Sequence, residues 1–140
     1  MATMTAGQPS GGLLPFTRLV LIVSAVVQLI FGAVGLFLVP LWNSFFWTSP
    51  LPAWPDAAMH FASLNYLATA IAALYALQRG TWESARTYFA FSFPYIILSV
   101  IIALITAADP GVPTIMWLYV LLSVLYLPAV AYAWRSQART

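Results

Sequence analysis

Few side chains in this sequence can take part in acid–base chemistry. Outside arginine and tyrosine, the titratable side chains are those of Asp56, His60, Glu83 and Asp109. General acid–base catalysis needs such groups close to a substrate, and these four have no spacing that is typical of a catalytic pair. No pattern for a serine hydrolase, a zinc protease, a phosphate-binding loop or a dinucleotide site occurs. We therefore expect no enzymatic activity.

His60 is the one residue suited to hold the metal of a haem or of a chlorophyll-type pigment. The chain has no cysteine, which excludes zinc–thiolate and iron–sulfur sites within it. A histidine near the membrane interface has a simpler interpretation as a hydrogen-bonding group. We predict no cofactor and no metal, and keep haem or pigment binding by His60 as an alternative hypothesis.

The elements that position these residues follow from composition. Hydrophobic residues make up 63% of the 140 residues and charged residues 6%, whereas about a quarter of a soluble domain is charged. The net charge of +2 is too small to indicate nucleic-acid binding. Four uncharged stretches are long enough to cross about 30 Å of hydrocarbon as helices, namely residues 19–39, 57–77, 87–107 and 115–134.

The sequence thus predicts an all-α membrane protein with four transmembrane helices in two antiparallel hairpins. The transmembrane domain covers residues 19–134, between tails at 1–18 and 135–140. With four crossings, all five arginines fall on one side of the membrane, and Asp56 and Asp109 fall on the other. Cations mark the cytoplasmic side of short loops. We expect both termini to be cytoplasmic and the protein to lie in the cell inner membrane.

Small residues predict which helix faces pack, because they let helices approach closely in lipid. Gly32 and Gly35 in the first span and Ala58 and Ala62 in the second are the predicted packing positions. Gln28 and Asn65 lie on the same two stripes at similar depth. An unpaired amide in hydrocarbon costs several kcal/mol. We therefore expect these two amides to pair.

The segment at residues 40–56, between the first two spans, is rich in proline and aromatic residues. Prolines at this density are expected to oppose a helix. The aromatic side chains have two interpretations: anchoring at the membrane interface, or docking to a partner subunit. The residues concerned are Trp42, Phe45, Phe46, Trp47 and Trp54. Near the other outer loop, Asp109-Pro110-Gly111 predicts a turn.

Two motifs resemble a group of uncharacterised four-span bacterial membrane proteins. They are Pro40-Leu41-Trp42 followed by Phe46-Trp47, and the turn Gln78-Arg79-Gly80-x-Trp82-Glu83-x-x-Arg86. The resemblance covers most of the chain. It implies the four-span fold and carries no assigned activity or functional residue.

Three hypotheses about function follow. The leading one is a non-catalytic accessory subunit of a larger membrane complex, such as a respiratory or photosynthetic electron-transfer assembly. Its partners would be other integral membrane subunits and the lipid bilayer, with bound lipids. The fourth span, which is bulky all round, would face lipid or that partner. The alternatives are a small-ligand carrier or transporter that uses Gln28 and Asn65, and a haem- or pigment-binding subunit that uses His60.

The predicted topology can be tested with single engineered cysteines, because the chain has none of its own. Cysteines at positions 44–55 should react with a membrane-impermeant maleimide added outside intact cells. A cysteine at Ser84, between Arg79 and Arg86, should react only after the membrane is permeabilised. Labelling of Ser84→Cys in intact cells would contradict the orientation.

Overall fold

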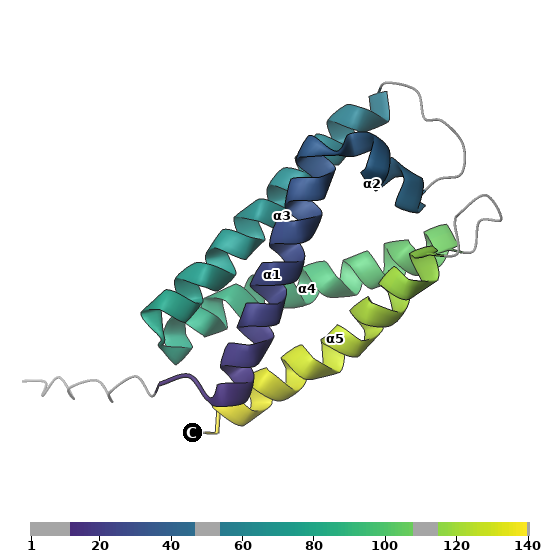
Figure 1. Ribbon diagram of the computed structural model, residues 1–140. Helices are drawn as coiled ribbons and strands as arrows, with labels where there is room; N and C mark the ends of the chain where they lie inside the picture. Colours follow the sequence, from purple (N-terminus) through teal and green to yellow (C-terminus); the bar gives the residue numbers. More distant parts are fainter. Residues whose placement is uncertain (1–11, 47–53, 108–114, 140) are drawn as a thin grey trace, which may run out of the picture.

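The computed structural model describes residues 12–46, 54–107 and 115–139, and these residues form five α-helices (Figure 1). The helices are α1 (Pro15–Phe37), α2 (Val39–Phe46), α3 (Trp54–Arg79), α4 (Trp82–Ala107) and α5 (Ile115–Gln137). All but α2 are long and apolar enough to cross a membrane. The predicted all-α membrane class with four candidate spans is confirmed. The expected turn at Asp109-Pro110-Gly111 lies outside the described residues.

The helices begin and end at residues suited to those positions. Pro15 is the first residue of α1, where proline loses no hydrogen bond and its fixed φ fits the helix. Between α3 and α4, Gly80 has a φ of +64°, which glycine adopts without steric cost. Thr81 then caps α4 through its Oγ1, which accepts the N–H of Ser84. The turn from α3 to α4 is therefore only two residues long.

The prediction that residues 40–56 avoid helix is wrong at both ends of this segment, and residues 47–53 lie outside the described residues. Val39–Phe46 forms α2, and α3 already begins at Trp54. Pro40 and Pro55 are each the second residue of their helix. In the first turn the missing N–H has no intrahelical partner in any case. Pro40 and Pro55 are therefore compatible with helix because each lies in a first turn.

The closest helix–helix approach involves the two predicted glycines of α1. A Cβ atom built on Gly32 would lie 2.7 Å from Leu67 Cγ and 3.1 Å from the Leu67 backbone nitrogen. A Cβ atom on Gly35 would collide with Ser63 Oγ. Both glycines are buried. They let α1 lie directly against α3, and this is the most extensive contact between any two helices of the described part.

The face of α3 that meets α1 differs from the expected one by about one residue. Ser63, Ala70 and Ala73 are fully buried, whereas Ala62 is half-buried and Asn65 is exposed. The alanine-rich sequence of α3 offers two small-residue stripes about 100° apart. The notch at Gly32 and Gly35 receives Ser63 and Leu67, and this selects the neighbouring stripe. The side chain of Ala58 lies outside the described residues.

The four long helices form two packed pairs. α1 packs with α3, and α4 packs with α5. The pairs converge where α3 joins α4 and separate toward the opposite end (Figure 1). α5 has the smallest buried share of the four spans, 17% against 33% for α1 and α4, as its bulky sequence predicts.

Three hydrogen bonds, called here the clamp, connect the segment before α1 to the α3–α4 turn and to the end of α5. Leu13 N–H donates to the Gly80 carbonyl at 3.2 Å. The Gln137 side chain, which is buried, donates from Nε2 to the Gly12 carbonyl at 3.2 Å. Its Oε1 accepts the N–H of Leu14 at 2.7 Å. The segment before α1 is thus held between the α3–α4 turn and the end of α5.

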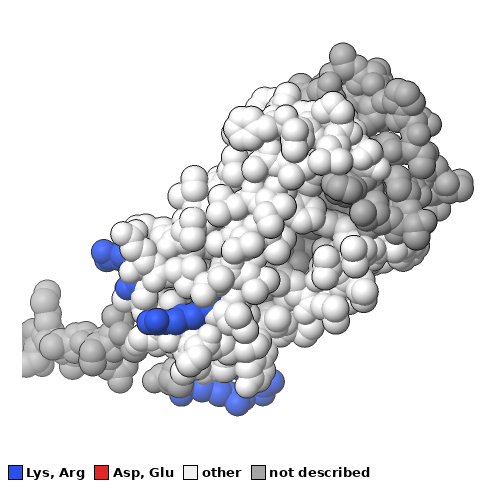
Figure 2. All heavy atoms as spheres, viewed as in Figure 1, with Lys and Arg blue, Asp and Glu red and all other residues white. Residues whose placement is uncertain are grey.

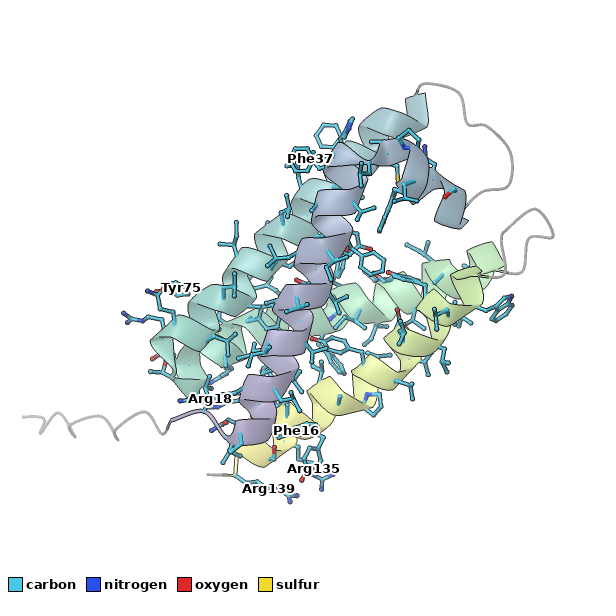
Figure 3. The ribbon with its side chains drawn as sticks, in the orientation of Figure 1. Phe16, Arg18, Phe37, Tyr75, Arg135 and Arg139 are labelled. Atoms are coloured by element: carbon cyan, nitrogen blue, oxygen red, sulfur yellow. The ribbon has the colours of Figure 1, made fainter. Side chains whose placement is uncertain are left out.

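The arginines gather at this same end (Figure 2). Arg18 lies in the first turns of α1, and Arg79 ends α3. Arg135 lies in the last turn of α5, shortly before Arg139. Figure 3 places Arg18, Arg135 and Arg139 together at one end of the molecule and Phe37 at the far end of α1. The charge segregation found in the sequence therefore corresponds to one end of the bundle, called here the arginine end.

Adding one methyl group at the α1–α3 contact should destabilise the fold. Gly32→Ala and Gly35→Ala should each cost about 1–3 kcal/mol of unfolding free energy, because overpacking displaces backbone or buried atoms. Thermal unfolding of the purified protein in mild detergent measures the effect. Ala33→Val, on the exposed face of α1, is the control and should unfold like the wild type. Unchanged stability of Gly35→Ala would contradict the close approach.

Candidate functional site

A cavity of about 190 Å³ lies between α1, α3, α4 and α5. In the described part of the chain its walls carry no charged side chain. One part of the wall is apolar and includes Val27, Phe31 and Ile96. Eight further lining residues carry a hydroxyl or an amide group, although most of the surface that faces the cavity is apolar. These residues are Ser24, Gln28, Tyr66, Tyr95, Ser99, Tyr119, Ser123 and Tyr126. We take this neutral polar cavity as the candidate functional site.

The cavity lies deep in the span. Gln28 is 13 residues from the start of α1, and Tyr66 is 13 residues before the end of α3. Tyr95 is 13 residues from the start of α4. At 1.5 Å per residue, all three lie about 20 Å from the arginine end. Three helices thus place polar groups at one depth, well inside the hydrocarbon layer.

Only one of the two polar atoms of the Gln28 amide has a hydrogen-bond partner among the described residues. Its Nε2 donates to the Tyr88 hydroxyl at 3.2 Å. Its Oε1 is buried, and no donor of the described residues reaches it. Such an atom costs about 1–3 kcal/mol in a protein interior.

One turn nearer the arginine end, Ser24 joins α1 to α5. Its Oγ donates to the Val20 carbonyl at 2.7 Å. It also forms a hydrogen bond with the Tyr126 hydroxyl. A serine has a single O–H hydrogen, and it is committed to Val20. Tyr126 is therefore the donor in its bond to Ser24, and this pair is satisfied without a ligand.

Toward the other end, an aromatic wall lines the cavity. The hydroxyls of Tyr66 and Tyr119 are 3.3 Å apart and share a hydrogen bond between α3 and α5. The ring of Phe31 lies 5.9 Å from that of Tyr66 and 6.0 Å from that of Tyr119. Tyr95 packs edge-on against Tyr66 at 6.4 Å. Centroid distances in this range are typical of favourable ring contacts.

The two amides expected to pair do not share a hydrogen bond. Gln28 pairs with Tyr88 of α4, and Asn65 is exposed on α3. The cause is the rotation of α3, which turns the Ser63 and Leu67 face toward α1. Asn65 does not line the cavity, whereas the next residue, Tyr66, does.

The other predicted site residues lie apart from the cavity. His60 is exposed on α3 and does not line it. Among the described residues, no group of three histidine, aspartate or glutamate side chains is arranged to bind a metal. Trp42 is buried, with its ring 5.0 Å from that of Phe31 and its Nε1 donating to Met59 Sδ. It packs inside the protein, contrary to the docking role expected for it.

The side chains of the other aromatic residues predicted to dock a partner lie outside the described residues. Trp47 lies outside the described residues. Phe45, Phe46 and Trp54 belong to described helices, but their side chains are outside the described part. Their assignment to an interface therefore stays a prediction.

The tyrosines are the functional residues that the sequence analysis did not single out. A signal was present, because tyrosine prefers the membrane interface and Tyr66, Tyr95 and Tyr126 lie in mid-span. Tyr88 and Tyr95 are seven residues apart on α4, and Tyr119 and Tyr126 are seven apart on α5. A spacing of seven puts each pair on one helix face. Two such faces indicate a polar seam in the bundle.

The site offers hydrogen bonds and aromatic surface without charge. A neutral ligand with a polar group can bond to Gln28 or a tyrosine hydroxyl while its apolar part contacts Phe31 and Val27. A charged ligand would meet no opposite charge there, and its desolvation would be uncompensated. The arrangement therefore suits binding of small uncharged molecules.

Two variants test whether Gln28 Oε1 lacks a hydrogen-bond partner in the folded protein. Tyr88→Phe leaves both polar atoms of Gln28 without a partner and should lower the unfolding free energy by about 1–3 kcal/mol. Gln28→Met removes the amide at similar length and should cost less than Tyr88→Phe. Thermal unfolding in detergent compares them. Equal losses for both variants would mean that the Gln28 carbonyl is satisfied in the folded protein.

Comparisons with protein-family models, with curated proteins and with solved structures gave no match. The functional assignment therefore depends on the residues of this chain. Its central feature is the neutral polar cavity with the half-satisfied amide of Gln28.

Proposed function

We propose that this protein binds a small, uncharged, ring-sized molecule in the neutral polar cavity and acts as a membrane carrier or receptor for it. The observation that carries the proposal is the buried Oε1 of Gln28, without a donor among the described residues, on a side chain that lines the cavity. This oxygen is enclosed by protein atoms and does not face the cavity in the conformation described, so a ligand O–H or N–H reaches it only after the amide rotates toward the cavity. Buried polar groups in native proteins nearly always have a partner.

The size of the cavity sets the size of the ligand. An engineered cavity of about 150 Å³ in another protein binds benzene. At about 190 Å³, this one has room for a single substituted ring. The aromatic wall of Phe31, Tyr66 and Tyr119 favours a flat ligand, since rings gain from offset or edge contacts.

The proposed setting is the cytoplasmic membrane, with the arginine end in the cytoplasm and the helices arranged as two antiparallel hairpins. Support comes from the five arginines at one end of the bundle and from the preference of cations for the cytoplasmic side. Trp82 and Trp134 lie against each other at this end, with ring centroids 5.4 Å apart. Tryptophan at this level is typical of a membrane interface.

Two other hypotheses have less support. An accessory subunit of an electron-transfer assembly would use the exposed apolar surface of α5, but lipid covers such a surface equally well. A haem or pigment site would use His60, which is exposed and apart from the cavity. Neither of these hypotheses uses Gln28 or the tyrosines that line the cavity.

Three simple rings of similar size test the proposal: phenol, benzene and benzoate. Phenol should raise the unfolding temperature of the full-length protein in detergent more than benzene, because it supplies a donor for Gln28. Benzoate should not bind at the cavity. In Gln28→Met, the affinity for phenol should fall by roughly fivefold, the value of one net hydrogen bond.

Asn65→Leu is the matched control, because it replaces the other intramembrane amide on an exposed surface. It should bind phenol like the wild type. Equal binding of phenol by the wild type and Gln28→Met, or failure of any neutral ring to bind, would overturn the proposal.

A further inference from the structure

A second cavity, of about 320 Å³, forms a groove between α4 and α5 and shares no lining residue with the neutral polar cavity. Phe89 and Val130 form its buried floor. Ala90, Pro94 and Ala131 form its exposed rim. Phe93 and Trp134 complete a lining without charged or amide side chains. We call it the α4–α5 groove.

Two arginines flank the groove toward the arginine end. Arg86 precedes Phe89 by three residues and Ala90 by four, and therefore lies on the same face of α4. On α5, Arg135 follows Ala131 by four residues and is adjacent to Trp134. Both arginines are exposed. The apolar groove thus has an exposed arginine at its end on each of the two helices.

Two tryptophans indicate how deep the arginine-side end of the groove lies in the membrane. The rings of Trp82 and Trp134 meet edge-on at 5.4 Å, and Trp82 also contacts Phe89. Paired tryptophans are typical of the headgroup level. Arg86 and Arg135 therefore lie where lipid phosphates lie, and the groove extends from there into the hydrocarbon.

We propose that the α4–α5 groove binds an anionic phospholipid from the leaflet on the arginine side. One acyl chain lies in the groove, and the phosphate lies between Arg86 and Arg135. The occupant is inferred from charge and position together: an apolar slot inside the span admits a hydrocarbon chain, and guanidinium groups bind phosphate oxygens in a bidentate manner. Glu83, one turn before Arg86, offsets part of its charge, so Arg135 contributes the larger share. This inference does not depend on a ligand in the neutral polar cavity.

The experiment uses the full-length protein in nanodiscs that contain phosphatidylglycerol and phosphatidylcholine with the same acyl chains. Native mass spectrometry after mild extraction measures the ratio of the two lipids that stay bound. Two arginines near phosphate should give the wild type a preference for phosphatidylglycerol of roughly 30-fold. In R86Q/R135Q this preference should fall to near parity.

The matched control is R18Q/R79Q, which removes the same charge from the same end of the bundle but from α1 and α3, neither of which lines the groove. It should keep the wild-type preference. Equal losses in the two double variants would show a diffuse attraction to the basic end and overturn the site.

The groove itself is tested with Ala131→Phe, which fills the rim and leaves both arginines in place. It should reduce retention of both lipids at least several-fold, whereas Leu125→Phe, on an exposed part of α5, should not. Unfolding temperatures near the wild-type value confirm that the variants are folded. Full retention of phosphatidylglycerol by Ala131→Phe would overturn the acyl-chain position.

Displacement of the lipid by millimolar inorganic phosphate would show that the arginines bind a free anion, and would overturn the lipid assignment.

Discussion

The close approach of α1 to α3 is the constraint on which the rest of the structure depends. Gly32 and Gly35 leave room for Ser63 and Leu67 of α3, and no side chain larger than hydrogen fits at either position without displacement. In lipid, where apolar burial does not drive helix association, such contacts supply much of the packing energy. Because α3 occupies the glycine face of α1, the α4–α5 pair cannot approach there. It meets the same stripe of α1 closer to the arginine end, through Ser24 and Gln28, and leaves the neutral polar cavity between the pairs.

Hydrogen bonds between helices then fix how the two pairs meet. Ser24 connects α1 with α5, Gln28 connects α1 with α4, and Tyr66 connects α3 with Tyr119 of α5. Each contributes about 0.6–2 kcal/mol, since separated helices in a membrane also find partners for such groups. The polar seam therefore serves structure as much as binding. In Gln28 the structural and the binding role belong to different atoms. Nε2 bonds to Tyr88 and stabilises the fold, whereas Oε1 has no partner among the described residues.

The parts of the fold that follow from length and composition could be predicted, and the parts that follow from contacts could not. An uncharged stretch of about 20 residues is stable in hydrocarbon only as a helix, so the four spans could be predicted. The rotation of α3 was not, because its alternative small-residue stripes look equivalent until Gly32 and Gly35 meet Ser63 and Leu67. That rotation moved Asn65 to the surface and brought Tyr66 into the cavity wall.

For the same reason, only part of the site was foreseen. Gln28 was identifiable as a polar group in an apolar span, but its partner Tyr88 belongs to another helix whose orientation is set by packing. Trp42 looked like an interface anchor because it follows a span. The short helix α2 instead turns it back onto Phe31. Sequence patterns thus located the polar groups, and the tertiary contacts decided which of them meet.

The clamp at the arginine end joins the segment before α1 to the last residue of α5. The Leu14 N–H and Gln137 Oε1 that it connects are 123 residues apart. During synthesis α1 emerges first and α5 last, so the backbone groups of Gly12 and Leu14 stay hydrated at the membrane surface while the other spans are made. The clamp can form only when Gln137 has left the ribosome. Synthesis of the whole of α5, and not the insertion of any earlier helix, is therefore required before this end of the bundle closes.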